Sequence, residues 1–138
     1  GNSQPLAVQP MSSAYVVETD VEIKGNASAG LMLFAKPDLY LGLELAPDGV
    51  LRRVEQGYRR YRWTRDERVD RRRLRLRITN LHQDVRFEYQ VDDGGWRLFQ
   101  PSMEVSFGAS LCVNLRPALF CHGDGAARFR GFEFRSVG

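Results

Sequence analysis

The sequence is poor in the residues that build metal centres and disulfide scaffolds. It has only two cysteines and two histidines among 138 residues. The spacing of Cys112 and Cys121 fits no zinc motif, and two cysteines do not make the disulfide framework of a small secreted domain. They could pair if residues 110–122 turned back as a hairpin, but a continuous strand with two buried free thiols is expected. No cofactor is expected either.

Long hydrophobic runs and helical periodicity are also missing. The longest apolar runs, among them Leu31–Ala35, are far too short to cross a bilayer, so no membrane partner is expected. No basic-then-apolar leader opens the chain, and its localisation stays open. A content of 43% hydrophobic and 27% charged residues is typical of one globular domain with a core of its own.

Apolar residues recur instead at every second position, which is the period of a β-strand. Leucines at 39, 41, 43 and 45 alternate with other residues, and Leu74, Leu76 and Ile78 alternate with arginines. We expect Leu41, Leu76 and Phe87 to point into the core. Asp92-Asp93-Gly94-Gly95 predicts a tight hairpin turn.

The whole pattern predicts about ten short strands joined by turns. Further turns are expected at Gly25-Asn26 and at Gly123-Asp-Gly125, with separate strands at 110–121 and 126–135. Residues 1–13 are interpreted as a lead-in segment and residues 14–138 as a single domain. The fold class is therefore all-β, an antiparallel β-sandwich or jelly roll.

Seven short motifs occur in an order and spacing that resemble the C-terminal concanavalin A-like module of family-43 glycoside hydrolases such as β-xylosidases. They are Gly30-Leu-Met-Leu-Phe34, Tyr40-Leu-Gly-Leu43, Leu74-Arg-Leu-Arg77, Phe87-Glu-Tyr89, Asp93-Gly-Gly-Trp96, Ala118-Leu-Phe-Cys-His-Gly-Asp-Gly125 and Phe129-Arg-Gly-Phe-Glu-Phe134. The resemblance covers residues 14–136 and implies a sandwich of the concanavalin A-like lectin/glucanase type. It also implies a noncatalytic accessory module for xylan- or arabinan-type glycosides. Such a module binds saccharide weakly, or packs on a glycoside hydrolase catalytic domain and completes it.

One aromatic and arginine-rich segment is the predicted saccharide contact. As a strand, residues 58–64 would place Arg59, Tyr61 and Trp63 on one face, where a ring can stack on a sugar while a guanidinium donates to hydroxyls. Tyr40 and Glu44, which point outward from a neighbouring strand, are expected behind them. Alternatively, Trp63 anchors in the core and the arginines are solvated. Trp96 is expected to pack in the core.

A catalytic alternative rests on Glu18, Asp20 and Glu22, which resemble the Glu-x-Asp-x-Glu strand of family-16 glucanases. Alternation places all three carboxylates on one face. A retaining glycosidase needs its two carboxyl groups about 5–5.5 Å apart, whereas residues 18 and 22 of a flat strand have Cα atoms about 13 Å apart. A solvated strand face explains the triplet equally well, and the chain is expected not to be an enzyme.

A second alternative is binding of a polyanion, either nucleic acid or an acidic polysaccharide. From Arg52 to Arg77 there are twelve arginines against four acidic residues, a local balance of +8. These arginines fall mainly at outward positions of alternating strands, where charged residues are expected in any case, so nucleic acid is not the expected partner. They would equally suit an interdomain surface, because guanidinium groups pair bidentately with carboxylates.

The remaining ionisable residues are expected to serve turns and surfaces. A structural calcium ion could use Asp48, Asp92, Asp93 or Asp124, but each is better explained as a turn former. His82 and His122 are predicted to lie at the surface.

Overall fold

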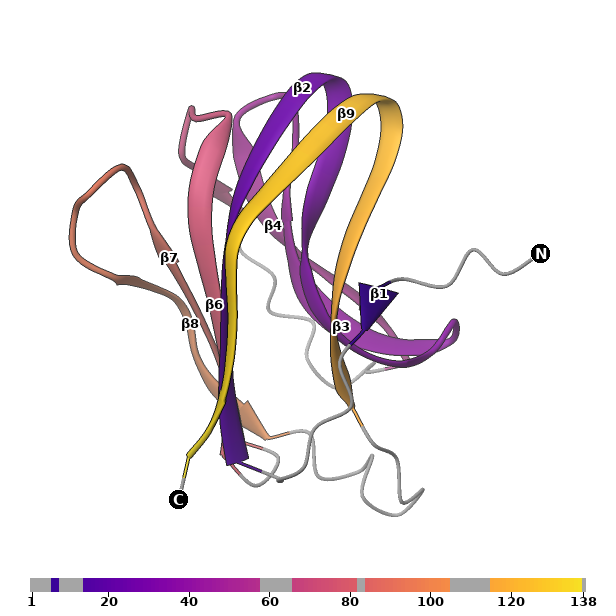
Figure 1. Ribbon diagram of the computed structural model, residues 1–138, viewed down its shortest axis with the longest axis vertical. Coiled ribbons are helices and arrows are strands. Elements are labelled where there is room, and N and C mark those ends of the chain that lie inside the picture. Colours follow the sequence, from indigo (N-terminus) through magenta and orange to yellow (C-terminus); the bar gives the residue numbers. More distant parts are fainter. Residues whose placement is uncertain (1–5, 8–13, 58–65, 82–83, 105–114, 138) are drawn as a thin grey trace.

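The computed structural model describes residues 6–7, 14–57, 66–81, 84–104 and 115–137 (Figure 1). Nine strands and no helix occur in these ranges, so they hold no helix that could cross a membrane. The strands are β1 (Leu6–Ala7), β2 (Ala14–Lys36), β3 (Leu39–Leu45), β4 (Val50–Gln56), β5 (Glu67–Arg68), β6 (Arg73–Leu81), β7 (Asp84–Gln90), β8 (Arg97–Glu104) and β9 (Arg116–Ser136).

All strand pairs are antiparallel, and two long strands join two layers. The first part of β2 pairs with β6, its last part pairs with β3, and β9 follows it along almost its whole length. One layer therefore has the order β8-β7-β6-β2-β9, and the other has the order β5-β4-β3-β2-β9-β1. In Figure 1, β2 and β9 arch together from one layer to the other. The predicted all-β sandwich class is confirmed.

We call the shared bend at residues 25–27 of β2 and 123–125 of β9 the arch. It shows that the turns predicted at these two places are wrong. Gly25 pairs with Gly125 and Ala27 pairs with Gly123, so β2 and β9 continue through both segments. Gly25 and Gly123 have φ angles of 68° and 92°, which a residue with a Cβ rarely adopts. The glycines therefore bend the paired strands sharply without ending them, and the strands predicted at 110–121 and 126–135 are not separate.

The predicted hairpin between β7 and β8 is confirmed. Asp92 adopts a φ of 53°, and the amide of Gly94 donates to the carbonyl of Val91 at 3.0 Å. A residue in the left-handed region at this point reverses the chain within a few residues.

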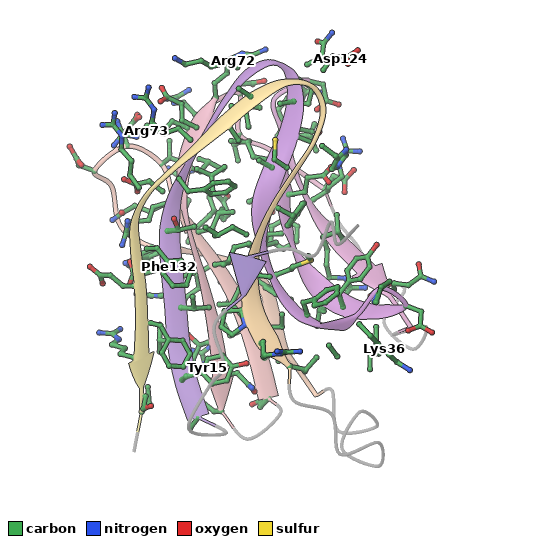
Figure 2. All side chains as sticks on the ribbon, turned by 45° about the vertical axis from the view of Figure 1, so that its right-hand side comes forward. Tyr15, Lys36, Arg72, Arg73, Asp124 and Phe132 are labelled. Atoms are coloured by element: carbon green, nitrogen blue, oxygen red, sulfur yellow. The ribbon has the colours of Figure 1, made fainter. Side chains whose placement is uncertain are left out.

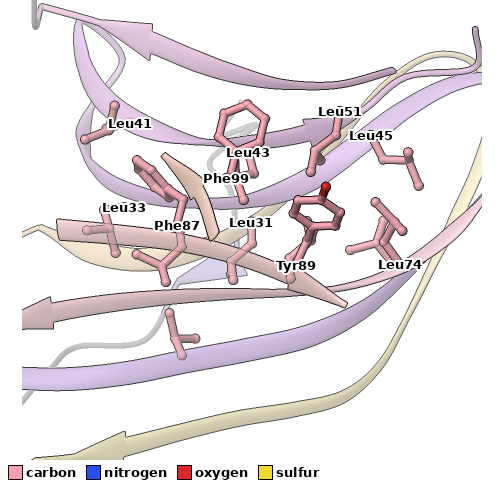
Figure 3. Packing of buried hydrophobic residues seen from close by; sticks show 14 of the residues in the cluster. Leu31, Leu33, Leu41, Leu43, Leu45, Leu51, Leu74, Phe87, Tyr89 and Phe99 are labelled. Carbon is pink, nitrogen blue, oxygen red and sulfur yellow. The ribbon is translucent and has the colours of Figure 1, made fainter. Parts of the chain in front are cut away.

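The core lies between the two layers (Figure 3). Leu41, Leu76 and Phe87 are fully buried, as predicted. Strand alternation sends their neighbours outward, so each layer also has an outer face, and these two outer faces differ in chemistry.

One ion pair interrupts this apolar interior. Arg53 on β4 is paired in register with Leu43, its side chain is 1% exposed, and it lies 3.1 Å from the carboxylate of Glu55. Burial lowers the pKa of Arg53 although the charge of Glu55 opposes this shift. Burial likewise raises the pKa of Glu55 against the charge of Arg53.

Candidate functional site

The predicted saccharide contacts divide into two groups. Arg59, Tyr61 and Trp63 lie outside the described residues and stay a prediction. Tyr40 and Glu44 are described, and both lie on the outer face of β3, opposite the side on which Leu41 and Leu43 enter the core.

The register of β2, β3 and β9 brings three further side chains to this outer face. Phe34 is paired with Tyr40, while Gly30 lies between Glu44 on one side and Phe120 on the other. His122 follows two residues after Phe120. We call the five side chains together the aromatic face: Phe34, Tyr40, Glu44, Phe120 and His122.

The rings of the aromatic face are arranged as two stacked pairs. The Phe34 and Tyr40 ring centroids are 6.5 Å apart with an interplanar angle of 22°. Phe120 and His122 are 6.4 Å apart with an angle of 8°. Phe34, Tyr40 and Phe120 are half-buried, so part of each side chain stays accessible.

A carboxylate–imidazole pair lies beside the second ring pair. Nε2 of His122 is 2.7 Å from Oε2 of Glu44. The side chain of Glu44 is only 9% exposed, whereas that of His122 is 62% exposed. The contact fixes the carboxylate in place and leaves the second imidazole nitrogen at the surface, where it can bond a ligand.

Two glycines let the strands beneath the aromatic face pack closely against one another. A Cβ added to Gly30 would collide with the carbonyl of Leu43 and would meet Cζ of Phe120 at 3.0 Å. A Cβ on Gly42 would collide with Leu31 and Met32. The absence of side chains at both positions lets neighbouring strands approach and lets the Phe120 ring lie over the strand.

The outer face of the other layer carries an ion-pair network. Nε of Arg75 donates to Glu18 at 2.6 Å, and its Nη1 donates to Asp20 at 3.1 Å. Nη2 of Arg75 donates to the carbonyl of Gly131 at 3.0 Å. Burial works to lower the pKa of Arg75, but the hydrogen bonds with Glu18 and Asp20 outweigh it and raise that pKa. We call this surface the charged face: Glu18, Asp20, Arg73, Arg75, Arg77 and Glu88.

The network gives two of the three carboxylates of the catalytic alternative a structural role. Glu18 and Asp20 both bond to Arg75, and Asp20 also lies 3.4 Å from Arg73. Glu22 is paired in register with Arg73 and with Arg128. The three residues share one face as predicted, and two of them, Glu18 and Asp20, join β2 to β6 through Arg75, which also bonds to the backbone of β9.

The arginines between Arg52 and Arg77 are also paired wherever the structure describes them. Seven lie within 4.0 Å of a carboxylate, and Arg72 donates to the carbonyls of Ile23 and Gly25. The pairs are Arg52–Asp48, Arg53–Glu55, Arg68–Asp70, Arg71–Asp92, Arg73–Asp20, Arg75–Glu18 and Arg77–Glu88. Each of these guanidinium groups therefore already has a partner within the protein, which weakens the case for polyanion binding.

Two residues lie nearer the solvent than predicted. Trp96 is half-buried rather than part of the core, and the guanidinium of Arg77 lies 3.9 Å from its ring centroid. Cys121 is a free thiol as predicted, but it is exposed rather than buried. Cys112 and His82 are outside the described residues, and His122 is exposed as predicted, although within a strand.

The four aspartates considered for calcium are spread over three places. Asp48 accepts from the amide of Val50 at 3.3 Å, and Asp92 and Asp93 form the β7–β8 turn, so these three are turn formers. Asp124 is paired with Asn26 inside the arch, which corrects its assignment to a turn. Within the described ranges, no three His, Cys, Asp or Glu side chains are grouped as a metal ion would need.

No family model matches this chain, and no curated protein matches it. Solved structures do. The family-43 glycoside hydrolase (GH43) protein BlXynB K247S of Bacillus licheniformis has a TM-score of 0.78 at 15% identity, over 96% of this chain and 29% of its own. The xylan β-1,4-xylosidase of Bacillus halodurans has a TM-score of 0.75 at 14% identity, over 94% of this chain and 29% of its own.

A third likeness is to a protein closer in length to this chain. A functionally unknown protein from Saccharomyces cerevisiae has a TM-score of 0.64 at 15% identity, over 96% of this chain and 74% of its own. This chain thus spans under a third of the GH43 proteins but most of the yeast protein. At these identities the likeness concerns the fold, and for the fold the predicted resemblance to a module of family-43 glycoside hydrolases is confirmed.

Proposed function

We propose that this chain is a noncatalytic accessory module of a glycoside hydrolase acting on xylan- or arabinan-type glycosides, and that it binds saccharide weakly on its aromatic face. The observation that carries the proposal is the placement of ring pairs around a fixed carboxylate–imidazole pair on one outer face. The small share of the GH43 proteins that this chain spans supports an accessory role beside a separate catalytic domain.

The chemistry of the aromatic face fits a neutral sugar. The apolar side of a sugar ring stacks on an aromatic plane, and its hydroxyl groups both donate and accept hydrogen bonds. Tyr40 and Phe120 supply accessible ring surface. Glu44 accepts from hydroxyls, and the free nitrogen of His122 bonds them as donor or acceptor.

The spacing of the two ring pairs favours an oligosaccharide. Gly30, beside Phe120, and Phe34, beside Tyr40, are four residues apart on β2, which corresponds to about 13 Å along a strand. This separation exceeds one sugar ring, so both ring pairs are used only by a ligand of several units. Packing on a catalytic domain is compatible with this role if the aromatic face stays open or extends a substrate groove.

Titration of the chain with xylohexaose and arabinohexaose, followed by amide NMR shifts, tests the proposal. We expect saturable shifts around the aromatic face, and Tyr40→Ala and Phe120→Ala should each weaken binding about twofold to twelvefold, the effect of losing one aromatic contact of about 0.5–1.5 kcal/mol.

The matched control is Phe132→Ala, because Phe132 is an exposed aromatic residue on β9 outside the aromatic face (Figure 2). It should bind like the parent chain. Absence of saturable shifts with a folded chain would refute saccharide binding, as would equal losses in all three variants.

A further inference from the structure

A cavity of about 440 Å³ opens on the charged face, beside the β7–β8 hairpin. Its polar lining comes from Asp20, Arg73, Arg75, Gln90, Asp92 and Asp93. Small-molecule sites usually have volumes of about 300–1,000 Å³, so the cavity is large enough for a small ligand. It lies on the layer opposite the aromatic face.

One wall of the cavity is held rigidly by the ion-pair network. Asp20 lies between Arg73 and Arg75, at 3.4 and 3.1 Å, and Arg75 is fixed further by Glu18. Among the described residues, only Nη2 of Arg73 contacts a carboxylate, and Figure 2 shows Arg73 at the surface. This wall offers mainly hydrogen-bond donors.

The other wall belongs to the hairpin and offers acceptors. Nε2 of Gln90 donates to the carbonyl of Gly94 at 2.6 Å, which turns its own carbonyl oxygen to other partners. The carboxylate of Asp93 has no hydrogen-bond or ion-pair partner among the described residues.

The charges of the lining select against charged ligands. Two arginines face three aspartates, and one of these, Asp92, is paired with Arg71 at 3.5 Å, so neither sign dominates the lining. An anion would approach the hairpin aspartates, and a cation would approach the two guanidinium groups. A ligand with neighbouring hydroxyl groups satisfies both walls at once, because each hydroxyl donates to a carboxylate and accepts from a guanidinium.

We propose that this cavity is a second binding site, for a neutral polyhydroxylated ligand of the saccharide class. The two sites lie on outer faces of different layers, so one module can hold two sugar chains or two parts of a branched one. The cavity stands on its own observations and does not depend on binding at the aromatic face.

Amide NMR titrations with xylotriose, glucuronate and glucosamine test this assignment. Xylotriose should shift residues of the hairpin and of β6, and Asp93→Ala and Gln90→Ala should each weaken this binding at least threefold. Asp38→Ala is the matched control, because Asp38 is an exposed aspartate in the β2–β3 turn, remote in the strand order from the hairpin. Tyr40→Ala should leave the cavity affinity unchanged.

The outcome separates the two proposals because each site has its own resonances. Shifts confined to the aromatic face would overturn the cavity assignment and leave the first proposal standing. Shifts confined to the hairpin and β6 would support the cavity assignment and refute saccharide binding at the aromatic face. Tighter cavity binding of glucuronate or glucosamine than of xylotriose would overturn the neutral ligand class, and equal loss in Asp38→Ala would overturn the site.

Discussion

The two outer faces of the sandwich use their polar side chains differently. On the charged face, Arg75 bonds to two carboxylates and to the backbone of β9, and most of its neighbours are paired in the same way. On the aromatic face, one pair, Glu44 with His122, lies among half-buried rings. Polar groups bonded across strands stabilise the fold, whereas accessible rings beside a fixed polar pair are suited to a ligand.

The largest effect that sharpens this comparison is expected at the glycines of the aromatic face. Gly42→Ala should lower the free energy of unfolding by about 3 kcal/mol, because its Cβ collides with Leu31 and Met32 and the strands must separate. Urea unfolding measures it. Gly95→Ala is the matched control in the layer that carries the charged face, since nothing lies within 4 Å of its added Cβ. Similar stability of the two variants would contradict this account of the aromatic face.

The centre of the charged face should show the next largest effect. Arg75→Met keeps the aliphatic part of the side chain but leaves Glu18 unpaired and largely buried, so a loss of about 2 kcal/mol is expected. Saccharide affinity at the aromatic face should not change.

Arg86→Met is the control for this variant. Arg86 is an exposed arginine of the same layer with no ion-pair partner among the described residues, so it should alter stability by less than about 0.5 kcal/mol. An equal loss from both variants would show that net charge, rather than the Arg75 contacts, stabilises the charged face.

The alternation of side chains was predictable from the sequence because it is a local property of a strand. Leu41, Leu76 and Phe87 are buried, and Arg73, Arg75 and Arg77 point outward, as the period of two requires. The Asp92–Gly95 hairpin was predictable for the same reason, since its turn residues act on their own backbone.

The contacts between distant strands were not predictable in the same way. Glu44 and His122 are 78 residues apart, and Glu18 and Arg75 are 57 apart, so their contacts depend on strand pairing. Gly123 and Gly125 resemble turn formers, so the sequence predicts two strands where the structure has the single strand β9. Within one continuous strand, Phe120 and His122 lie two residues apart and therefore on the same face. This alternation is the feature of the sequence that identifies them as neighbours.

A smaller effect concerns the ion pair between Arg53 and Glu55, on the inner side of the layer that carries the aromatic face. Burial raises the pKa of Glu55, so between the ordinary glutamate value and this raised value the folded state binds more protons than the unfolded state. The contribution of Glu55 to stability is therefore present at low pH and is lost as pH rises through the raised pKa.

Glu55→Gln should remove this loss. Urea unfolding from pH 4 to pH 7 should show the parent chain losing stability relative to the variant as pH rises. Glu133→Gln is the control, because Glu133 is exposed and lies 3.9 Å from Arg75 on the charged face. A parent chain that gains stability relative to Glu55→Gln over this range would mean that attraction to Arg53 outweighs burial. The inner pair would then stabilise the fold as the outer network does.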